Sequence, residues 1–170
     1  LAAEGVYFRR AVSGCPWCTP FRGSLLTGRY PQHCVVRTPQ VMDPSLTTIA
    51  HALSAAGYET AYFGKWHLAW DKSMPVPEID GRLRHDAIPV SREMRGGFDT
   101  WIGYNNGNTM FDIFLQGHAA DGEEVPLYRI EGYETDRLTD LLIDFVKDRA
   151  GSPAQKARPF FAALSVEPPH

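Results

Sequence analysis

The order of apolar patterns along the chain constrains its fold more than any other feature. Residues 135–149 repeat apolar side chains at helical spacing, and residues 159–166 form a short, almost wholly apolar run. Such a run is typical of a strand that is covered on both faces. A helical pattern at 44–57 followed by an aromatic-rich strand at 58–63 repeats the same order earlier in the chain. This alternation predicts an α/β fold, with a mostly parallel sheet and helices on both of its faces.

The remaining segments give weaker patterns. Residues 6–12 are expected to form a strand, and residues 111–115 another. Pro20 suits the first turn of a short helix that ends at Gly28. Residues 71–95 are polar and without a period, which predicts a long loop that acts as a lid or a binding loop. Asp121 and Gly122 are expected to form a turn.

Composition excludes several classes of function. The 170 residues suit about one domain, and a hydrophobic share of 44% with a charged share of 22% is ordinary for a globular protein. The net charge is -3 and the basic residues are scattered, so neither nucleic acid nor an acidic membrane surface is expected as a partner. No apolar run approaches the roughly 18 residues of a membrane span. Three cysteines are too few for a disulfide scaffold.

The segment that contains two of the cysteines can be read in two ways. Cys15 and Cys18 have the Cys-x-x-Cys spacing of a redox dithiol or of half a zinc site. A redox motif needs its first cysteine at a helix N-terminus, whereas here Cys18 lies next to the expected helix start. A zinc site would need His33 and Cys34 as further ligands, and the side chains of adjacent residues point apart. A thiol-redox domain and a zinc site are therefore the less favoured alternatives.

Read from Cys18, the same segment carries a different motif. Cys18–Thr19–Pro20–Phe21–Arg22, with Leu25–Leu26 and Thr27–Gly28, resembles the signature of the formylglycine-dependent sulfatases of the alkaline phosphatase-like superfamily. Phe21 departs from that signature, where a small residue is usual. Further stretches that resemble the family follow in its order along the chain: 64–68, 97–99, 135–140 and 159–170.

This resemblance implies a fold and a reaction. In that family the cysteine is oxidised to an aldehyde by a formylglycine-generating enzyme or an anaerobic sulfatase-maturing enzyme. One hydroxyl of the hydrated aldehyde then attacks the sulfur of a sulfate monoester and expels the alcohol. Loss of a proton from the second hydroxyl re-forms the aldehyde and releases sulfate. Cys18 would be that residue, and the protein would be a sulfuric ester hydrolase.

The resemblance also assigns roles to four further side chains. Arg22 would hold the modified side chain, and its spacing from Cys18 places both on one helix face. Lys65 would bind a sulfate oxygen and His67 would take a proton from the nucleophile; in an extended segment both point the same way. His170 would contact the sulfate or the leaving group, as a substrate-binding residue and proton donor.

A divalent metal, most simply calcium, is implied as well. Of the family's ligands only Cys18, as formylglycine, would lie in this chain; the acidic pair is expected before Leu1, and the other ligands beyond His170. Residues 1–170 are thus expected to be part of a single catalytic domain, and the chain alone is expected to be inactive and poorly stable. The resemblance suggests a periplasmic, secreted or lysosomal location.

Alternatives remain open at this stage. A phosphonate monoester or phosphodiester hydrolase of the same superfamily can use the same modified cysteine, and a non-catalytic binding module could keep the fold. The substrate could be a sulfated small molecule or a sulfated carbohydrate. The other histidines, namely His33, His51, His85 and His118, have no motif partner. Asp136, Asp140, Asp144 and Asp148 repeat along one helix face and are expected to be solvated.

Overall fold

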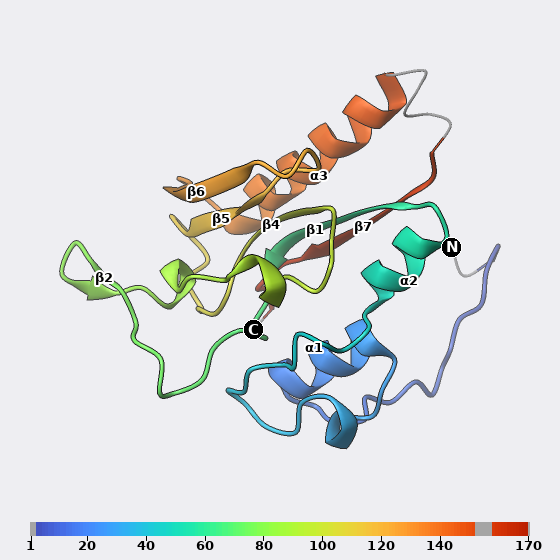
Figure 1. The fold of residues 1–170 in the computed structure, drawn as a ribbon, viewed down its shortest axis with the longest axis horizontal. Helices are drawn as coiled ribbons and strands as arrows, with labels where there is room; N and C mark the ends of the chain where they lie inside the picture. Colours follow the sequence, from blue (N-terminus) through green and yellow to red (C-terminus); the bar gives the residue numbers. More distant parts are fainter. Residues whose placement is uncertain (1–2, 152–157, 170) are drawn as a thin grey trace.

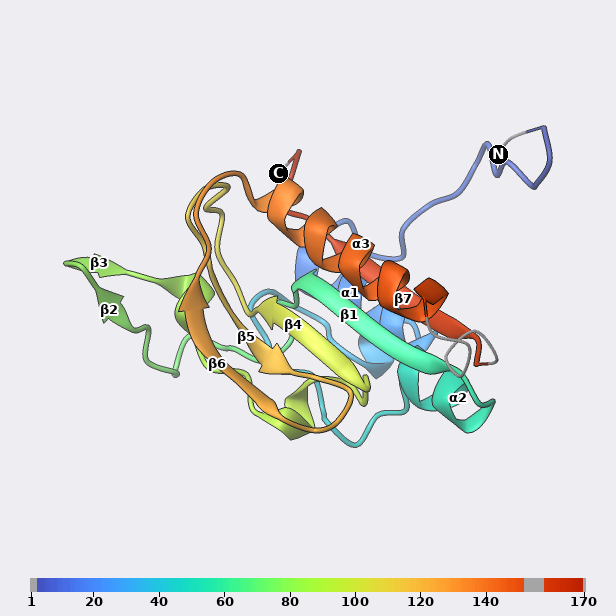
Figure 2. The ribbon, with the colours of Figure 1, turned by 90° about the horizontal axis from the view of Figure 1, so that it is seen from above.

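A five-stranded mixed sheet forms the centre of the computed structural model, which describes residues 3–151 and 158–169. The strand order is β6-β5-β4-β1-β7 (Figures 1 and 2). The strands are β1 (Glu59–Lys65), β4 (Thr100–Tyr104), β5 (Phe114–His118), β6 (Glu124–Arg129) and β7 (Phe160–Ser165). β4, β1 and β7 run parallel, while β5 and β6 add antiparallel strands at one side.

Helices cover both faces of this sheet, as the sequence predicted. α3 (Glu134–Gly151) lies across one face, and α1 (Cys18–Thr27) and α2 (Ile49–Ala55) lie on the other (Figure 1). Because side chains alternate along a strand, β1 supplies Tyr62 to the core beside α1 and α2 and Phe63 to the core beneath α3. In the part of the chain that the structure describes, no helix is long and apolar enough to cross a bilayer.

The helix predictions are confirmed, with shifted boundaries. α1 ends where Gly28 adopts a left-handed conformation, at a φ of 66°. α2 begins at Ile49 because Thr48 caps it, and Thr48 and His51 form a reciprocal capping box. The four aspartates of α3 are all exposed, as expected of a solvated face.

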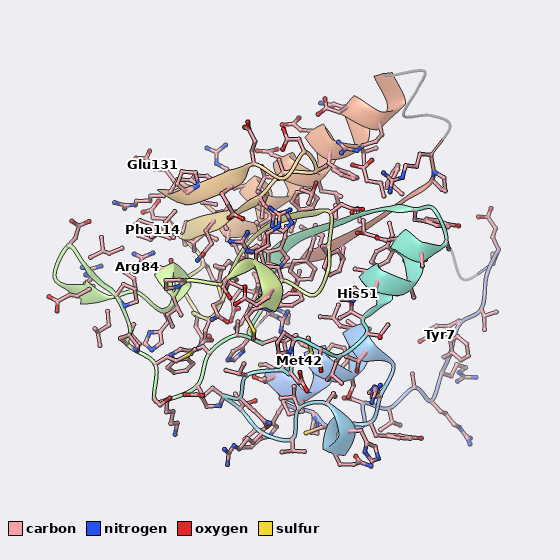
Figure 3. The ribbon with its side chains drawn as sticks, viewed as in Figure 1. Tyr7, Met42, His51, Arg84, Phe114 and Glu131 are labelled. Atoms are coloured by element: carbon pink, nitrogen blue, oxygen red, sulfur yellow. The ribbon has the colours of Figure 1, made fainter. Side chains whose placement is uncertain are left out.

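Several strand predictions are wrong. Residues 6–12 form no strand, and Tyr7 is 73% exposed on an N-terminal arm that runs away from the sheet (Figure 3). The strand expected at 111–115 begins instead at Phe114, since Asp112 has a φ of 55° that interrupts extended backbone. β4 and β6 were not predicted. β7 was expected to be covered on both faces, and it does pack Ala163 against one core and Ala162 against the other, but it pairs only with β1 and stays partly exposed.

The long loop at 71–95 is confirmed, although it is anchored to the sheet. It contains a small hairpin, β2 (Glu78–Ile79) with β3 (Arg82–Leu83), and two short 3-10 turns. Arg84 and Asp86 form an ion pair, and Asp86 accepts a hydrogen bond of 2.9 Å from the backbone N–H of Phe114. The guanidinium of Arg84 also lies over the ring of Phe114, beside which Figure 3 shows it.

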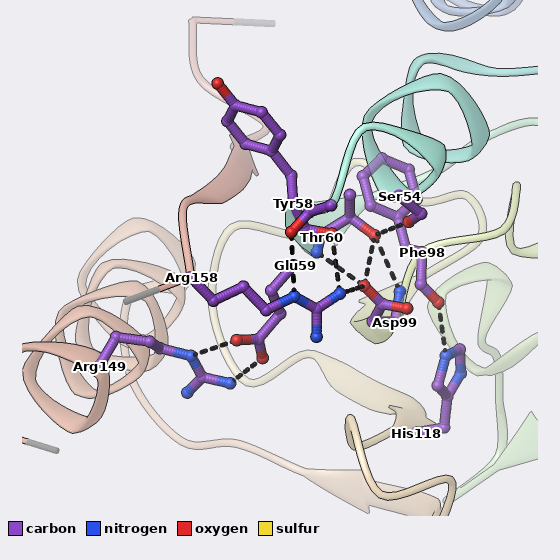
Figure 4. A network of polar contacts seen from close by, with 10 residues as sticks. Ser54, Tyr58, Glu59, Thr60, Phe98, Asp99, His118, Arg149 and Arg158 are labelled. Carbon is purple, nitrogen blue, oxygen red and sulfur yellow. Dashed lines mark hydrogen bonds and ion pairs between the residues drawn. The ribbon is translucent and has the colours of Figure 1, made fainter. Parts of the chain in front are cut away.

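Polar contacts hold the amino ends of the parallel strands together (Figure 4). The Asp99 carboxylate accepts hydrogen bonds from the backbone N–H and the hydroxyl of Thr60, at 2.9 and 3.2 Å. Glu59, at the start of β1, pairs with Arg149 of α3. The candidate site lies at the opposite end of the sheet, where the parallel strands have their carboxyl ends.

At these carboxyl ends, β1 approaches its neighbours β4 and β7 closely. Gly64 pairs with Gly103 of β4 and with Ser165 of β7. A Cβ atom on Gly64 would lie 2.0 Å from the carbonyl oxygen of Ser165, and the backbone there has a φ of 107°. Only glycine fits at this point, and the next residue along β1 is Lys65.

Candidate functional site

A cavity of about 510 Å³ opens at the carboxyl ends of β1 and β4, beside the N-terminus of α1. Its walls come from five segments that are distant in the sequence. The carboxyl ends of the strands are the usual place for a ligand site in an α/β sheet. The lining residues are Cys18, Thr38, Pro39, Lys65, His67, Trp70, His85, Asn106, Gly107 and Asn108.

Cys18 reaches this cavity as the first residue of α1, where the helix dipole favours negative charge. Its side chain is partly buried. Cys15 and Cys34 are free thiols, so Cys15 forms no disulfide with Cys18.

Lys65 is the last residue of β1, and its side chain is only 2% exposed. Its Nζ lies 2.6 Å from Oε2 of Glu167 and 3.2 Å from the backbone carbonyl oxygen of Gly107. The following residue, Trp66, turns into the core, where its ring packs edge to face against Tyr62. A buried ammonium group is therefore held at the floor of the cavity.

His67 lies two residues further on and is 6% exposed. The extended geometry expected at this residue is wrong: β1 ends at Lys65, and His67 has a φ of 56°. Its backbone N–H donates to the carbonyl oxygen of Asn105 at 2.5 Å, which fixes this turn. Left-handed backbone at a non-glycine residue costs about 1–3 kcal/mol and is typical of functional sites.

Arg22 lies behind this cavity and does not line it. Its Nη1 donates to the carbonyl oxygen of Lys65 at 2.6 Å and to the hydroxyl of Ser165 at 2.7 Å. The hydroxyl of Tyr62 donates to the same carbonyl oxygen. Arg22 thereby ties α1 to the ends of β1 and β7, so its visible role is to position the backbone of Lys65.

Two aromatic side chains complete the cavity and were not predicted. Trp70 and His85 are partly buried, and their rings pack edge to face at 5.5 Å between centroids. The neighbours of His85 are the anchored pair Arg84 and Asp86, which explains how a loop residue is fixed at this place. In the sequence, only the expectation that residues 71–95 form a binding loop pointed to a role for His85.

A second acidic side chain lies beneath Lys65. Glu134, at the start of α3, is fully buried and accepts a hydrogen bond of 2.8 Å from the hydroxyl of Tyr104. Both of its carboxylate oxygens lie 3.2 Å from the backbone N–H of Glu167. Burial raises the pKa of the Glu134 carboxyl above its usual value, and burial beside Glu134 likewise raises the pKa of Tyr104.

The fifth predicted residue, His170, lies outside the described residues, whose last member is Pro169. Among residues 3–151 and 158–169, no group of three or more His, Cys, Asp or Glu side chains could hold a metal ion. The described part of the chain therefore supplies no metal site of its own.

A family model described as Sulfatase matches residues 1–170. The chain belongs to the sulfatase family. One sulfatase relative, the Endo-4-O-sulfatase of Bacteroides thetaiotaomicron, is 30% identical over the whole chain, which spans 34% of that protein. The Ulvan-active sulfatase of Formosa agariphila is 43% identical over 59% of the chain and 17% of its own length. The chain thus spans about a third or less of the curated sulfatases that it matches.

Solved sulfatase structures share the fold. The putative sulfatase yidJ from Bacteroides fragilis superposes with a TM-score of 0.77 over 99% of this chain and 37% of its own, at 24% identity. Another structure, described as a complex with its substrate D-glucosamine-2-N,6-O-disulfate, gives a TM-score of 0.59 over 94% of this chain and 25% of its own, at 26% identity. The fold described above is therefore that of part of a sulfatase domain.

Proposed function

We propose that the full-length protein hydrolyses sulfate monoesters at the cavity that Cys18 lines. The observation that carries this proposal is that Cys18, Lys65 and His67, which come from two separate motifs, line one cavity in a chain of the sulfatase family. The whole-length family match supports the reaction class.

The side chains around the cavity suit this reaction. A sulfate ester is an anion that repels nucleophiles, so a fixed cation near its oxygens lowers the barrier. The Nζ of Lys65 binds a sulfate oxygen, and its position is set by Arg22 through the Lys65 carbonyl group. The imidazole of His67 takes up the proton that the nucleophile gives up.

The cofactors belong to the proposal as well. Cys18 fits the modification, because it lies on the cavity wall, partly buried, at the N-terminus of α1. Conversion to formylglycine by a maturing enzyme would supply a hydroxyl nucleophile that can later release sulfate. We expect the ligands of a divalent ion, other than residue 18, to lie outside residues 1–170, so no step is assigned to that ion.

The test is to express the full-length protein with a sulfatase-maturing enzyme, together with the variants Cys18→Ala and Cys15→Ala. We expect turnover of an aryl sulfate by the wild type and by Cys15→Ala, and a loss of at least about 10³-fold in Cys18→Ala. Mass analysis of the peptide that contains residue 18 should show conversion of the thiol to an aldehyde. Unmodified Cys18 under these conditions, without turnover, would favour the non-catalytic binding module instead.

We further propose that the substrate is a sulfated carbohydrate. The partly buried ring of Trp70 and the amide groups of Asn106 and Asn108 line the same cavity. Aromatic rings pack against the apolar face of a sugar, while amides hydrogen-bond its hydroxyls. The substrate named for one structural neighbour, a glucosamine disulfate, supports this choice.

Substitution of Trp70 tests the substrate class. Trp70→Ala should lower kcat/KM for a sulfated monosaccharide by about tenfold, because the ring loses its stacking contact. Trp17→Ala is the matched control, since Trp17 is 60% exposed and does not line the cavity. Equal kinetics for wild type and Trp70→Ala on every sulfated sugar tested would contradict the carbohydrate proposal and leave the sulfatase proposal intact.

A further inference from the structure

The carboxylate of Glu167 is the closest charged partner that the structure shows for Lys65. The two charged groups are 2.6 Å apart, and their side chains are 2% and 1% exposed. Glu167 follows β7, and Lys65 ends β1, which is the parallel neighbour of β7. The carboxylate therefore lies at the carboxyl ends of the strands, as does the cavity that Lys65 lines.

Neighbouring groups keep this carboxylate in place. The backbone N–H of Glu167 is bound by the carboxylate of Glu134 from α3. In the amide orientation that satisfies both its oxygen and its nitrogen, the Asn108 side chain donates a hydrogen bond to Oε1 of Glu167 at 3.1 Å. The titratable groups packed around Glu167 come from three elements, namely Lys65 of β1, Tyr104 of β4 and Glu134 of α3. Glu167 does not itself line the cavity, and these contacts hold its carboxylate against Lys65, which does.

This arrangement has an electrostatic consequence for an anion in the cavity. An oxyanion that binds the Lys65 ammonium also lies near the Glu167 carboxylate and is repelled by it. The repulsion grows in proportion to the charge of the anion, and it is strong where water is excluded. A sulfate monoester carries one negative charge, whereas inorganic sulfate carries two and a phosphate monoester carries close to two at neutral pH.

We propose that Glu167, acting through Lys65, is the residue that makes this site select singly charged oxyanion esters over doubly charged oxyanions. This inference rests on the proposed function, since it concerns the same cavity. Glu167 then serves two ends. It disfavours phosphate monoesters as substrates, and it weakens the hold on inorganic sulfate once the ester has been cleaved. Glu167 is a positioning residue, because it contacts Lys65, which in turn binds the anion.

The experiment compares wild type and Glu167→Gln in the matured full-length protein. The Gln side chain keeps the shape and loses the charge. Relative to the KM for an aryl sulfate, the inhibition constants of inorganic sulfate and of phenyl phosphate should fall by about tenfold in Glu167→Gln. Glu167→Asp keeps the charge, so it should lower kcat while the ratio of these constants stays near that of the wild type. An unchanged or opposite ratio in Glu167→Gln would overturn the proposal.

Glu134→Gln is the matched control, because it alters a buried carboxyl that contacts the backbone of Glu167 and not Lys65. A purely structural disturbance would change both Gln variants alike, whereas the proposal expects the ratio to move in Glu167→Gln alone.

A second measurement needs no variant and holds if Glu167→Gln fails to fold. In the wild type, binding of phenyl phosphate should weaken as its second proton is lost near about pH 6, while binding of singly charged methyl phenyl phosphate stays level. Equal or tighter binding of the doubly charged form would overturn the proposal. Absence of any sulfatase turnover would contradict the proposed function itself. Turnover with an unchanged ratio of inhibition constants to KM in Glu167→Gln would contradict only the proposed role of Glu167.

Discussion

At the scale of single residues, the site is organised by buried charge around the end of β1. One ammonium group, Lys65, lies near two carboxyl groups, Glu167 and Glu134. Placing two anions beside one cation in a buried cluster is costly unless one carboxyl holds a proton. Burial raises the pKa of Glu134, while the hydrogen bond donated by the Tyr104 hydroxyl opposes that rise. The net direction favours Glu134 as the group that takes up a proton, and Lys65 and Glu167 form the ion pair.

The raised pKa of Glu134 predicts how stability depends on pH. Its folded-state pKa lies above the usual value of 4.5, so its stabilising contribution is complete below that value and is lost as pH rises through the folded-state pKa. Glu134→Gln cannot ionise and avoids this loss. We expect the free energy of unfolding of Glu134→Gln, relative to wild type, to become more favourable between about pH 5 and about pH 8.

Urea unfolding at both pH values measures this difference. Glu131→Gln, three residues earlier and exposed, is the control and should show no such trend. A Glu134→Gln effect that is the same at both pH values would mean that the buried carboxyl does not titrate differently on unfolding.

At the scale of secondary structure, the sequence was a reliable guide where local patterns are long. α3 has a clear apolar face, and α1 and α2 have glycine at or just beyond their ends. β6 was missed because Pro126 argues against a strand, yet an edge strand tolerates proline where no backbone N–H is needed. β4 was missed because it is short and lies directly before an Asn/Gly-rich turn.

The site follows the same division. Cys18, Lys65 and His67 could be proposed as neighbours because they fall in motifs next to recognisable elements. Glu167 and His85 could not, since nothing in their local sequence tells that the fold brings one to Lys65 and the other to Trp70. Contacts of this kind depend on strand order and loop anchoring, which local periodicity does not encode.

The close approach of strands at Gly64 makes a prediction about β1. Gly64→Ala would place a Cβ atom 2.0 Å from the Ser165 carbonyl oxygen, in a left-handed conformation, so strands must separate next to Lys65. We expect a loss of about 3 kcal/mol or more in the free energy of unfolding, together with a loss of activity. Thermal unfolding of purified protein measures the first, and aryl sulfate turnover the second.

Gly151→Ala is the matched control for this substitution. Gly151 is the last residue of α3, and a Cβ atom there would meet nothing within 4 Å. Alanine should be neutral there or stabilising by about 0.5 kcal/mol. Wild-type stability in Gly64→Ala would show that β1 and β7 can be spaced further apart than the structure has them.

At the scale of the whole molecule, the sheet ends in two edge strands, β6, which carries Pro126, and β7. β7 is an edge strand, and beside it lies a second cavity of about 530 Å³ with mostly apolar walls, including Phe21, Leu25 and Phe161. Leu164 of β7 is 36% exposed in this region. An exposed apolar edge strand invites pairing with another chain. The chain spans about a third of the length of such relatives. We therefore expect further sulfatase sequence to cover β7 in the full-length protein.

The substitution Leu164→Lys should therefore act in opposite directions in two forms of the protein. In the isolated 170-residue chain, a charge on the open edge should slow aggregation, as charged residues do on natural edge strands. In the full-length protein the same lysine would be buried without a partner and should lower the free energy of unfolding by about 2 kcal/mol or more. Light scattering measures the first effect and denaturant unfolding the second. Ile143→Lys, at a residue of α3 that is 41% exposed, should change neither by much. If Leu164→Lys were harmless in the full-length protein, β7 would be an open edge there too, and the sheet would need no strand beyond it.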